Sequence, residues 1–534
     1  MSTFHDPLVA RPLDVRDPRL ALRALARLPY PFLLHSSLRD PRGRWSFFGA
    51  DPFEVYRGGD WDAALAAWRA RAAQRAGSDG HSHVRDRGDP GDRLQDGGLP
   101  RVPFTGGAVG YWSYDFGRRL ERIPALAADD LGLPDFVLGL YDVVGAFDHA
   151  SGEAWLFSSG LPLAGPEARR RAEARGEEFA RRIEGARAPG RGAPAPEGNH
   201  APGSREPAAA GSARLARSTF SPEGYCRAVE MVQDHIRRGD IFQANLSQRW
   251  TLPHPAGRPG GSRPGMEPRE RTADGGLVAA ASGGDAGLLG LALDVFDSLA
   301  TVSPAPFAAF FGAGDHAIAC ASPERFLEVR GRRIEARPIK GTRPRGACAV
   351  EDETLGAELA LSAKDRAENV MIVDVLRNDL GRVAETGSVA VPELCVLETF
   401  PQVFHLTSTV TGRLRDGLDA FDLLRAAFPG GSITGAPKIR AIEILERLEP
   451  TRRHIYTGSV GYVDFGGDAD WNIAIRTVLV TRDALHFAAG GGITVESDPA
   501  AEYLETLHKA EGVRLGLVLT LGPVLLAPTP AVPA

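Results

Sequence analysis

The sequence predicts a large chain of mixed helix and strand, and two observations support this class. The 534 residues are 43% hydrophobic and 24% charged, which is ordinary globular composition and enough for one very large domain or two. From Phe296 to about Pro523, strand-like and helix-like runs alternate with few breaks. The candidate functional residues concentrate in this part of the chain.

The first region, residues 1–161, contains short apolar runs at 32–34 and 45–48 and a helical pattern at 61–71. Residues 77–101 are polar and are expected to form a solvated loop, and the apolar segment 136–148 is expected to be a strand. We therefore treat residues 1–161 as one N-terminal region.

The composition changes in residues 162–217. Residues 169–187 could form an exposed charged helix, but the Ala-, Pro- and Gly-rich remainder cannot bury a core. We predict a disordered linker over 162–217. A second Gly-, Pro- and Arg-rich stretch, about 253–290, interrupts a dense segment and is predicted to be a low-complexity surface insertion. The rest of 218–525 is predicted to be one catalytic domain.

Composition also excludes several classes of protein. A net charge of −6 and a pI near 6.2 give no electrostatic case for a nucleic-acid partner. The four cysteines lie far apart, without a CxxC pair, which argues against disulfides and zinc and favours a reducing compartment. No apolar run approaches the roughly 18 residues of a membrane span, and the first residues lack a signal-peptide core. We expect a soluble, cytoplasmic protein without a membrane partner.

Two segments each present a pair of acids. Residues 362–381 have the pattern of one helix, in which Asp365 and Glu368 are three apart and so share a face. Residues 498–509 repeat the pattern with Glu502 and Glu505. Together the four carboxylates could hold a hard cation such as Mg²⁺. Alternatively, the first pair is a solvated acidic first turn, and Glu505 forms a surface ion pair with Lys509.

Two glycine clusters stand near these helices. Residues 430–436 are predicted to form a turn that leads into a helix starting near Pro437, and such a helix start suits a carboxylate. Residues 490–492 are predicted to form a second turn after the strand 485–489, where backbone N–H groups can approach a ligand. The alternative for each cluster is a tight turn without a ligand.

A lysine and a glutamate complete the candidate site. Lys340 lies between Ile339 and Gly341, and Glu324 ends a short loop upstream. A lysine among apolar neighbours loses part of its preference for the charged form and becomes a usable nucleophile. The alternative is an ordinary surface lysine.

Taken together, these segments resemble the chorismate-utilising enzymes, a family that includes anthranilate, aminodeoxychorismate, isochorismate and salicylate synthases. The matching blocks occur in one order at residues 239–249, 322–327, 337–346, 365–383, 404–412, 428–446, 456–462, 471–477 and 489–506. The resemblance implies an α+β fold like that of anthranilate synthase component I. In this fold, large antiparallel β-sheets pack as a sandwich with helices outside.

Two positions separate the branches of this family. The members that aminate chorismate at ring carbon four carry Lys where this chain has Lys340, whereas anthranilate synthases carry Ala. Members that use water carry a lysine base at the position of Gln243, and an amide cannot take a proton from water. The resemblance thus implies amination by ammonia, for p-aminobenzoate and folate synthesis. Anthranilate synthase component I and a non-catalytic chorismate-binding paralogue are the alternatives.

The resemblance also implies roles for individual residues. Lys340 would attack the ring as nucleophile, Glu324 would protonate the departing hydroxyl, and Mg²⁺ would be held by Glu368 and Glu505 with support from Asp365 and Glu502. The residues expected to bind substrate are Gln243, Thr342, His405, Ile433, Thr434, Gly435, Tyr456, Arg476, Gly490, Gly491, Gly492 and Lys509. For His405, packing between strands is the alternative. No GxCxG nucleophile elbow is present, so ammonia is expected from a separate glutamine amidotransferase subunit or from free ammonium.

Overall fold

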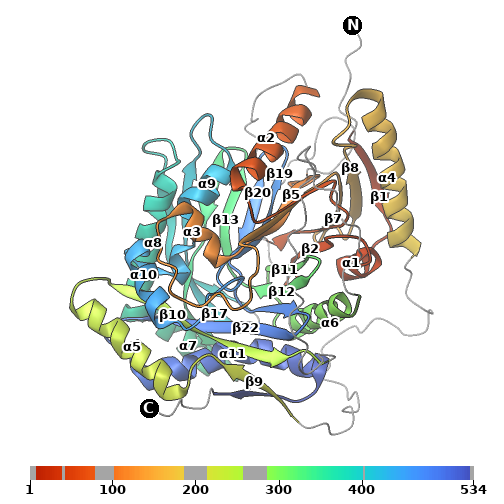
Figure 1. Cartoon of the computed structure of the whole chain (residues 1–534). Helices are drawn as coiled ribbons and strands as arrows, with labels where there is room; N and C mark the ends of the chain where they lie inside the picture. Colours follow the sequence, from red (N-terminus) through yellow and green to blue (C-terminus); the bar gives the residue numbers. More distant parts are fainter. Residues whose placement is uncertain are drawn as a thin grey trace.

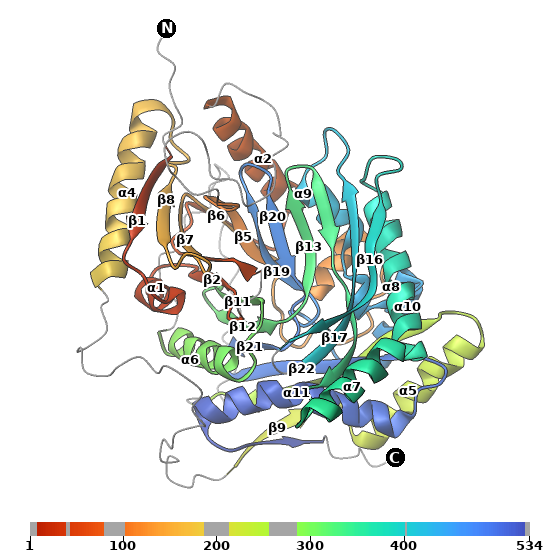
Figure 2. The same ribbon diagram turned by 180° about the vertical axis from the view of Figure 1, so that it is seen from behind.

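The computed structural model describes residues 8–38, 43–78, 102–185, 213–255, 286–400 and 403–528. Within these residues, no helix is both long enough and apolar enough to cross a membrane. Two large sheets lie at the centre of the molecule, and helices surround them (Figures 1 and 2).

The first sheet, sheet A, contains thirteen of the described strands. In spatial order they are β1 (Val9–Leu13), β8 (Ala154–Ser158), β7 (Val143–Asp148), β3 (Trp45–Gly49), β2 (Phe32–His35), β11 (Phe307–Gly312), β12 (His316–Ser322), β21 (Thr477–Thr481), β22 (Ala484–Ile493), β10 (Gln243–Pro253), β9 (Arg214–Ser218) and β23 (Val524–Ala527), with β18 (Gly435–Ala436) paired to β10. Its described ladders are antiparallel except that between β23 and β9.

The second sheet, sheet B, contains ten of the described strands. In spatial order they are β15 (Ile339–Pro344), β17 (Val403–Arg413), β14 (Arg333–Ala336), β13 (Arg325–Arg330), β20 (Ala469–Asn472), β19 (Ser459–Asp464), β5 (Gly107–Trp112), β6 (Phe136–Tyr141) and β4 (Glu54–Arg57), with β16 (Ala390–Thr399) paired to β17. The strand predicted at 136–148 is two strands, β6 and β7, which belong to different sheets.

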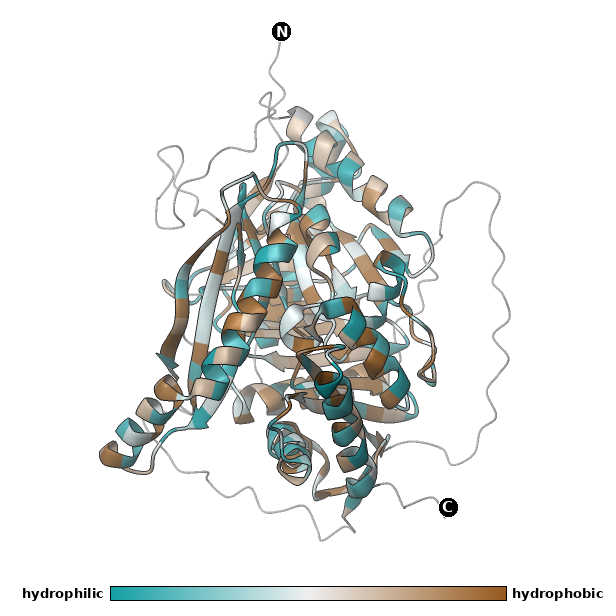
Figure 3. Cartoon of the chain, turned by 90° about the vertical axis from the view of Figure 1, so that its left-hand side faces the viewer, coloured by the Kyte–Doolittle hydropathy of each residue, from teal (hydrophilic) through white to brown (hydrophobic). Residues whose placement is uncertain are grey.

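The helices lie outside the sheets. They are α1 (Pro18–Leu25), α2 (Trp61–Ser78), α3 (Gly117–Leu120), α4 (Gly165–Gly185), α5 (Pro222–Arg237), α6 (Ala286–Val302), α7 (Ala349–Leu361), α8 (Ala363–Gly381), α9 (Ala420–Ala427), α10 (Lys438–Leu448) and α11 (Pro499–Leu521). Figure 3 shows hydrophobic residues concentrated on the strands, whereas the outer helices carry many hydrophilic residues.

Three apolar layers hold the sandwich together. Between the sheets, Phe32 and Leu479 of sheet A pack with Val109 and Tyr111 of sheet B. A second cluster joins sheet A to α1, α4, α6 and α11, and a third joins sheet B to α2, α8 and α9. Burial of apolar side chains on both faces of each sheet is the main stabilising contribution to such a layered fold. The predicted α+β sandwich with helices outside is confirmed.

The chain before residue 161 and the chain after residue 218 contribute strands to both sheets. In sheet A, β2 pairs with β11, and in sheet B, β5 pairs with β19 over six residue pairs. The two predicted regions are therefore segments of chain that share their sheets and their cores.

The prediction of a disordered linker over 162–217 is wrong for its first part, because residues 165–185 form α4. The helix buries Ala168, Ala172, Gly176, Phe179 and Ile183, whose spacing of three or four places them on one face against sheet A. The high charge of this segment obscured that narrow apolar stripe. Residues 186–212 lie outside the described part of the chain, and β9 begins at 214.

The predicted surface insertion at about 253–290 lies mostly outside the described residues, since 256–285 are not among them. Its last residues, 286–290, are the first turn of α6, so the ordered segment starts earlier than predicted. The predicted loop 77–101 lies mostly outside the described residues as well.

Candidate active site

The centre of the candidate site is a strand of glycines. Gly490, Gly491 and Gly492 belong to β22 and pair in register with Ser247, Leu246 and Asn245 of β10, so the prediction of a glycine turn here is wrong. A Cβ on Gly492 would lie 2.0 Å from Gln243 Nε2, and a Cβ on Gly491 would lie 2.9 Å from Glu502 Oε2. Glycine is required because side chains from neighbouring elements fill the space beside the backbone.

Helix α8 brings the first acid pair to this strand. Ser362 caps the helix as predicted, accepting a hydrogen bond from the backbone N–H of Asp365 at 3.2 Å. Glu368 Oε2 lies 3.5 Å from the position of a Cβ on Gly492. Asp365 packs instead against Gly341 and forms an ion pair of 3.3 Å with Arg343.

Helix α11 brings the second acid pair, and Asp498 caps it as predicted. Glu502 is buried and accepts a 2.6 Å hydrogen bond from Ser497 Oγ, while its Oε2 has no partner among the described residues. Glu505 forms the expected ion pair with Lys509 at 2.7 Å, and the Lys509 ammonium also donates to the Gly490 carbonyl at 2.9 Å.

Burial and neighbouring charges shift the pKa values of three of these acids. Burial raises the pKa of Glu368, and the charges of Asp365 and Glu502 add to that effect against the attraction of Lys340. Burial likewise raises the pKa of Glu502. For Glu505 burial also acts to raise the pKa, but the neighbouring ammonium of Lys509 outweighs it, so the pKa is lowered.

These carboxylates fit a magnesium ion whose remaining ligands come from water or from a bound molecule. In the described part of the chain, no three Asp, Glu, His or Cys side chains are close enough together to hold a metal by themselves. Mg²⁺, however, usually takes one or two carboxylates and fills its octahedron with water and ligand oxygens. Glu368 lies beside Gly492, Glu505 lies beside Gly491, and Glu502 adds an unpartnered buried oxygen beside Gly491.

Glu324 and Lys340 form the second part of the site. Glu324, between β12 and β13, is buried and accepts a 2.7 Å hydrogen bond from Ser432 Oγ. Burial raises its pKa to about 7, although Ser432 and the charge of Lys340 favour the ionised form. Burial lowers the pKa of Lys340, against the attraction of Glu368 and Glu324. The pair therefore offers a protonated acid and an amine of reduced basicity close to neutral pH.

The glycine-rich segment before α10 supports these groups through its backbone. Residues 431–433 form a 3₁₀ turn, β18 follows, and α10 begins at Lys438, close to the predicted start. The Thr434 carbonyl accepts the backbone N–H of Asn245 at 2.8 Å, and the Ile433 carbonyl accepts from Arg453 at 2.9 Å. Gly435 has φ +150° and lies against the backbone of β10, where a Cβ would meet the Gln243 carbonyl at 2.2 Å.

His405 and Thr342 face each other across β15 and β17. Thr342 Oγ1 and His405 Nδ1 share a hydrogen bond of 2.9 Å, and the ring of His405 meets that of Phe400 edge-on. His405 is 4% exposed. Both residues thus belong to the strand pair β15 and β17, and β15 also carries Lys340, the candidate amine.

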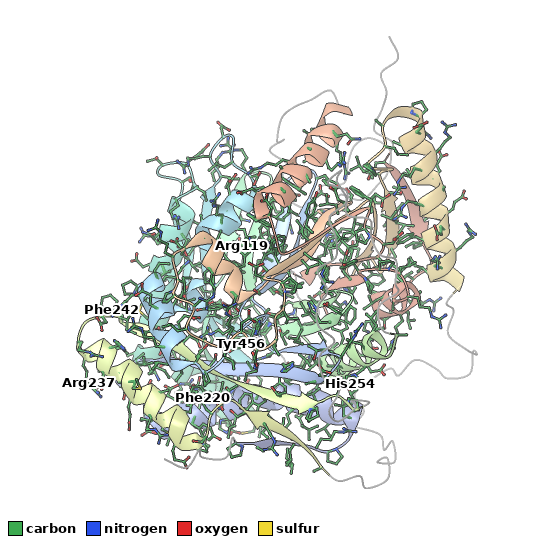
Figure 4. All side chains as sticks on the ribbon, in the orientation of Figure 1. Arg119, Phe220, Arg237, Phe242, His254 and Tyr456 are labelled. Atoms are coloured by element: carbon green, nitrogen blue, oxygen red, sulfur yellow. The ribbon has the colours of Figure 1, made fainter. Side chains whose placement is uncertain are left out.

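Arg476 and Tyr456 approach from loops beside the same sheets. Arg476 is in the left-handed backbone region with φ +50° and donates to Ser303 Oγ at 3.3 Å. No carboxylate of the described residues pairs with it, and burial lowers its pKa, which makes it a ready partner for an anion. Figure 4 shows Tyr456 in the middle of the molecule and Phe242, the residue before Gln243, at its edge.

The structure adds residues that the sequence did not single out. Ser432 holds the carboxyl of Glu324 across 108 residues of sequence. Lys364 of α8 lies 3.8 Å from Glu502 and links the two acid helices. Asn245 shares the face of β10 with Gln243. The one sequence feature that could have indicated Asn245 is its position two residues after Gln243. This spacing places the two side chains on one face only if the segment is a strand, as β10 is.

Comparison with known proteins gives one consistent family. The model for the family described as chorismate binding enzyme matches residues 40–260 and 286–514. Aminodeoxychorismate synthase component 1 of Klebsiella aerogenes is 42% identical over 419 residues, which are 78% of each chain. Anthranilate synthase component 1 of Thermus thermophilus is 37% identical over 505 residues, which are 94% of this chain and 95% of that one. The crystal structure of anthranilate synthase component I from Streptococcus pneumoniae TIGR4 is 28% identical with a TM-score of 0.65, covering 89% of this chain and 93% of that one.

Proposed function

Since this chain belongs to the chorismate binding enzyme family, we propose that it aminates chorismate at ring carbon four and releases 4-amino-4-deoxychorismate. Similarity to relatives named aminodeoxychorismate synthase component 1 supports this activity. The observation that carries the proposal is the half-buried Lys340, which is close enough to Glu324 for each charge to shift the pKa of the other group.

In the first step, the neutral Lys340 amine attacks ring carbon two. The ring electrons shift as the bond between carbon four and its hydroxyl breaks, and Glu324 gives its proton to the departing oxygen, which leaves as water. A carboxyl with a pKa of about 7 still holds a proton in a large fraction of molecules at neutral pH. The adduct nitrogen then releases its extra proton to the Glu324 carboxylate.

In the second step, ammonia attacks carbon four of the adduct. The electrons shift back, the bond between carbon two and the Lys340 nitrogen breaks, and the lysine leaves with a proton returned by Glu324. Dividing one difficult displacement into two steps is the general advantage of covalent catalysis. It also directs nitrogen to carbon four, because the lysine occupies carbon two.

Magnesium belongs to this proposal as a bound cofactor. Glu368 and Glu505 would hold it, with Asp365 and Glu502 in support, and it would supply a positive charge that binds and polarises a substrate carboxylate. Arg476, which has no carboxylate partner among the described residues, would bind a second substrate carboxylate.

We propose that the nitrogen source is a separate glutamine amidotransferase subunit. The words "component 1" in the names of the relatives are consistent with a second component. The enzyme would then be a transaminating transferase of p-aminobenzoate and folate synthesis, in the cytoplasm.

Anthranilate synthesis is the second candidate, because relatives named anthranilate synthase component 1 are similar over nearly the whole chain. It predicts that Lys340 takes no part in the reaction and that nitrogen enters at carbon two. A half-buried lysine of lowered pKa close to a carboxyl with a pKa of about 7 favours the first candidate.

The test is to incubate the purified protein with chorismate, Mg²⁺ and ammonium at alkaline pH and to identify the product by mass and chromatography. A product that keeps the enolpyruvyl group, and that an added lyase converts to p-aminobenzoate, is the expected result. Anthranilate with pyruvate would instead assign the enzyme to tryptophan synthesis.

The covalent step has its own test. Chorismate and Mg²⁺ without ammonia should leave a mass adduct on the peptide that contains Lys340. The peptide of the half-exposed Lys364 is the internal control and should remain unmodified. An unmodified Lys340 peptide, together with full activity of the Lys340→Ala variant, would exclude the lysine adduct.

A further inference from the structure

Two amide side chains of β10 lack hydrogen bonds in the described part of the molecule. Gln243 and Asn245 are 1% and 9% exposed, and Gln243 Oε1 and Asn245 Oδ1 are buried without a partner. Nearly all buried polar atoms of folded proteins are hydrogen-bonded, because an unmet acceptor keeps the cost of leaving water. Two such atoms on alternate residues of one strand indicate a place for a ligand that donates hydrogen bonds.

Both amides face the glycine strand at the centre of the site. A Cβ on Gly492 would lie 2.0 Å from Gln243 Nε2, and a Cβ on Gly490 would lie 3.0 Å from Asn245 Oδ1. Residues 243 and 245 share one face of β10, and Glu368 approaches the same Gly492. The two amides therefore lie on the side of the sheet that Glu368 approaches.

The backbone of Asn245 is held on both sides, which fixes the position of its amide. Its N–H donates to the Thr434 carbonyl at 2.8 Å, and its carbonyl accepts from Arg453. Arg453 is itself held by an ion pair of 2.7 Å with Glu449. The point at which the Asn245 side chain leaves the strand is therefore fixed.

A pocket continues from this position along the same face of β10. It is a small hollow bordered by Thr219, Ser247, Glu449, Tyr456 and Ala488, among others. Ser247 and Ala488 have the same orientation in the sheet as Asn245 and Gly490, two residues away in each strand. Thr219 is partly exposed, so the pocket opens at the surface, and its lining residue Ser247 is two residues from Asn245 on β10.

The chemistry of the two oxygens selects the ligand. The carboxylates and the ether oxygen of chorismate only accept hydrogen bonds, so they cannot satisfy a carbonyl oxygen. Its ring hydroxyl can donate, but in the proposed reaction that hydroxyl leaves in the first step, before the nucleophile attacks. Ammonia has three N–H donors and one lone pair, and the lone pair must stay free in order to attack carbon. Neutral amide oxygens hold ammonia through its N–H groups and leave that pair exposed, whereas a carboxylate would favour the unreactive ammonium ion.

We propose that Gln243 and Asn245 form the subsite that holds ammonia for its attack, and that the pocket beside Tyr456 admits it. This inference depends on the proposed amination of chorismate and adds to it the position of the nucleophile. Asn245 contributes a residue that the reading of the sequence did not assign to the site.

The experiment measures steady-state kinetics with ammonium chloride as the nitrogen source and magnesium present, for the parent and for Asn245→Leu, which has nearly the same shape. Loss of one buried hydrogen bond should raise KM for ammonium about tenfold or more and leave KM for chorismate within about twofold. In Asn245→Leu the Lys340 adduct should still form without ammonia. When ammonium is added, the adduct should disappear more slowly in this variant than in the parent.

A second variant guards against misfolding of the first. Asn245→Asp keeps both acceptor positions but prefers the ammonium cation, so kcat should fall without a rise in KM for ammonium. Gln248→Leu is the matched control, because Gln248 lies on the opposite face of β10 and is fully paired with Ser218 and Thr506. It should lower stability and leave KM for ammonium within about twofold.

The outcomes separate the two proposals. A parent that forms no aminated product contradicts the proposed function and with it the subsite. A parent that aminates normally, with unchanged KM for ammonium in Asn245→Leu, overturns the subsite alone. A rise in KM for chorismate equal to that for ammonium also overturns it, because Asn245 would then bind the ring hydroxyl.

Discussion

Removal of the Glu324 carboxyl should stabilise the protein at high pH. Glu324 has a pKa of about 7 in the folded chain against 4.5 for an ordinary glutamate. Because the folded state holds this proton more tightly, stability falls as pH rises from 4.5 to 7 and is constant above that. At about 1.4 kcal/mol per pKa unit, the cost at high pH is about 3 kcal/mol, and most of it arises between pH 5 and pH 8.

The Glu324→Gln variant carries no titrating group at this position, so it should lack that part of the pH dependence. Urea unfolding followed by tryptophan fluorescence at pH 5 and pH 8 gives the free energy of unfolding of both proteins. Between the two pH values the parent should lose roughly 2 to 3 kcal/mol more than the variant. Taking the difference between pH values cancels any effect of the amide that does not depend on pH.

Activity should change in the opposite direction. Glu324→Gln cannot protonate a leaving hydroxyl, and kcat should fall by about two to four orders of magnitude. Equal pH dependence of unfolding in parent and variant would show that the carboxyl titrates as in water, and the argument from burial would then be wrong.

Three further predictions concern the same site. Ser432→Ala removes the hydrogen bond that favours ionised Glu324, so the pH at which stability stops falling should move up by about one unit, as measured by urea unfolding across pH; an unmoved limit would contradict it. Lys340→Ala should abolish both the covalent mass adduct and the carbon-four product, and retention of that product would remove lysine from the mechanism. Glu505→Gln should raise the Mg²⁺ concentration for half-maximal activity about tenfold, whereas Glu511→Gln, which breaks only an ion pair with Arg514, should not.

The helix ends of the site could be predicted from local chemistry. Ser362 and Asp498 cap their helices through hydrogen bonds to N–H groups three residues on, and such contacts depend on a few neighbouring residues. The acid pairs on the first turns therefore follow directly from the sequence.

The glycine strand could not be predicted in this way. Gly490–Gly492 have the composition of a turn, yet they continue β22, because the space beside them is filled by Gln243 and Glu502 from other elements. Tertiary packing decided the backbone conformation there, and no local signal reports on it.

The partnership of Glu324 and Lys340 shows the same limit for the site. The two residues are sixteen positions apart, and the strands of sheet B bring them into each other's field. From the residues alone, Lys340 resembled any lysine next to glycine. Only the family resemblance linked it to Glu324, and nothing in the sequence linked Glu324 to Ser432.

The sharing of both sheets by distant segments has a consequence for synthesis in the cell. Strand β2 pairs with β11, whose residues follow roughly 270 positions later. At about 5 to 20 residues per second, a ribosome needs about 15 to 50 s to supply that partner. For this interval the edge of β2 and its apolar side chains have no native strand to cover them. The nascent chain is therefore expected to depend on chaperones, and slower translation should increase aggregation of the unfinished sheet.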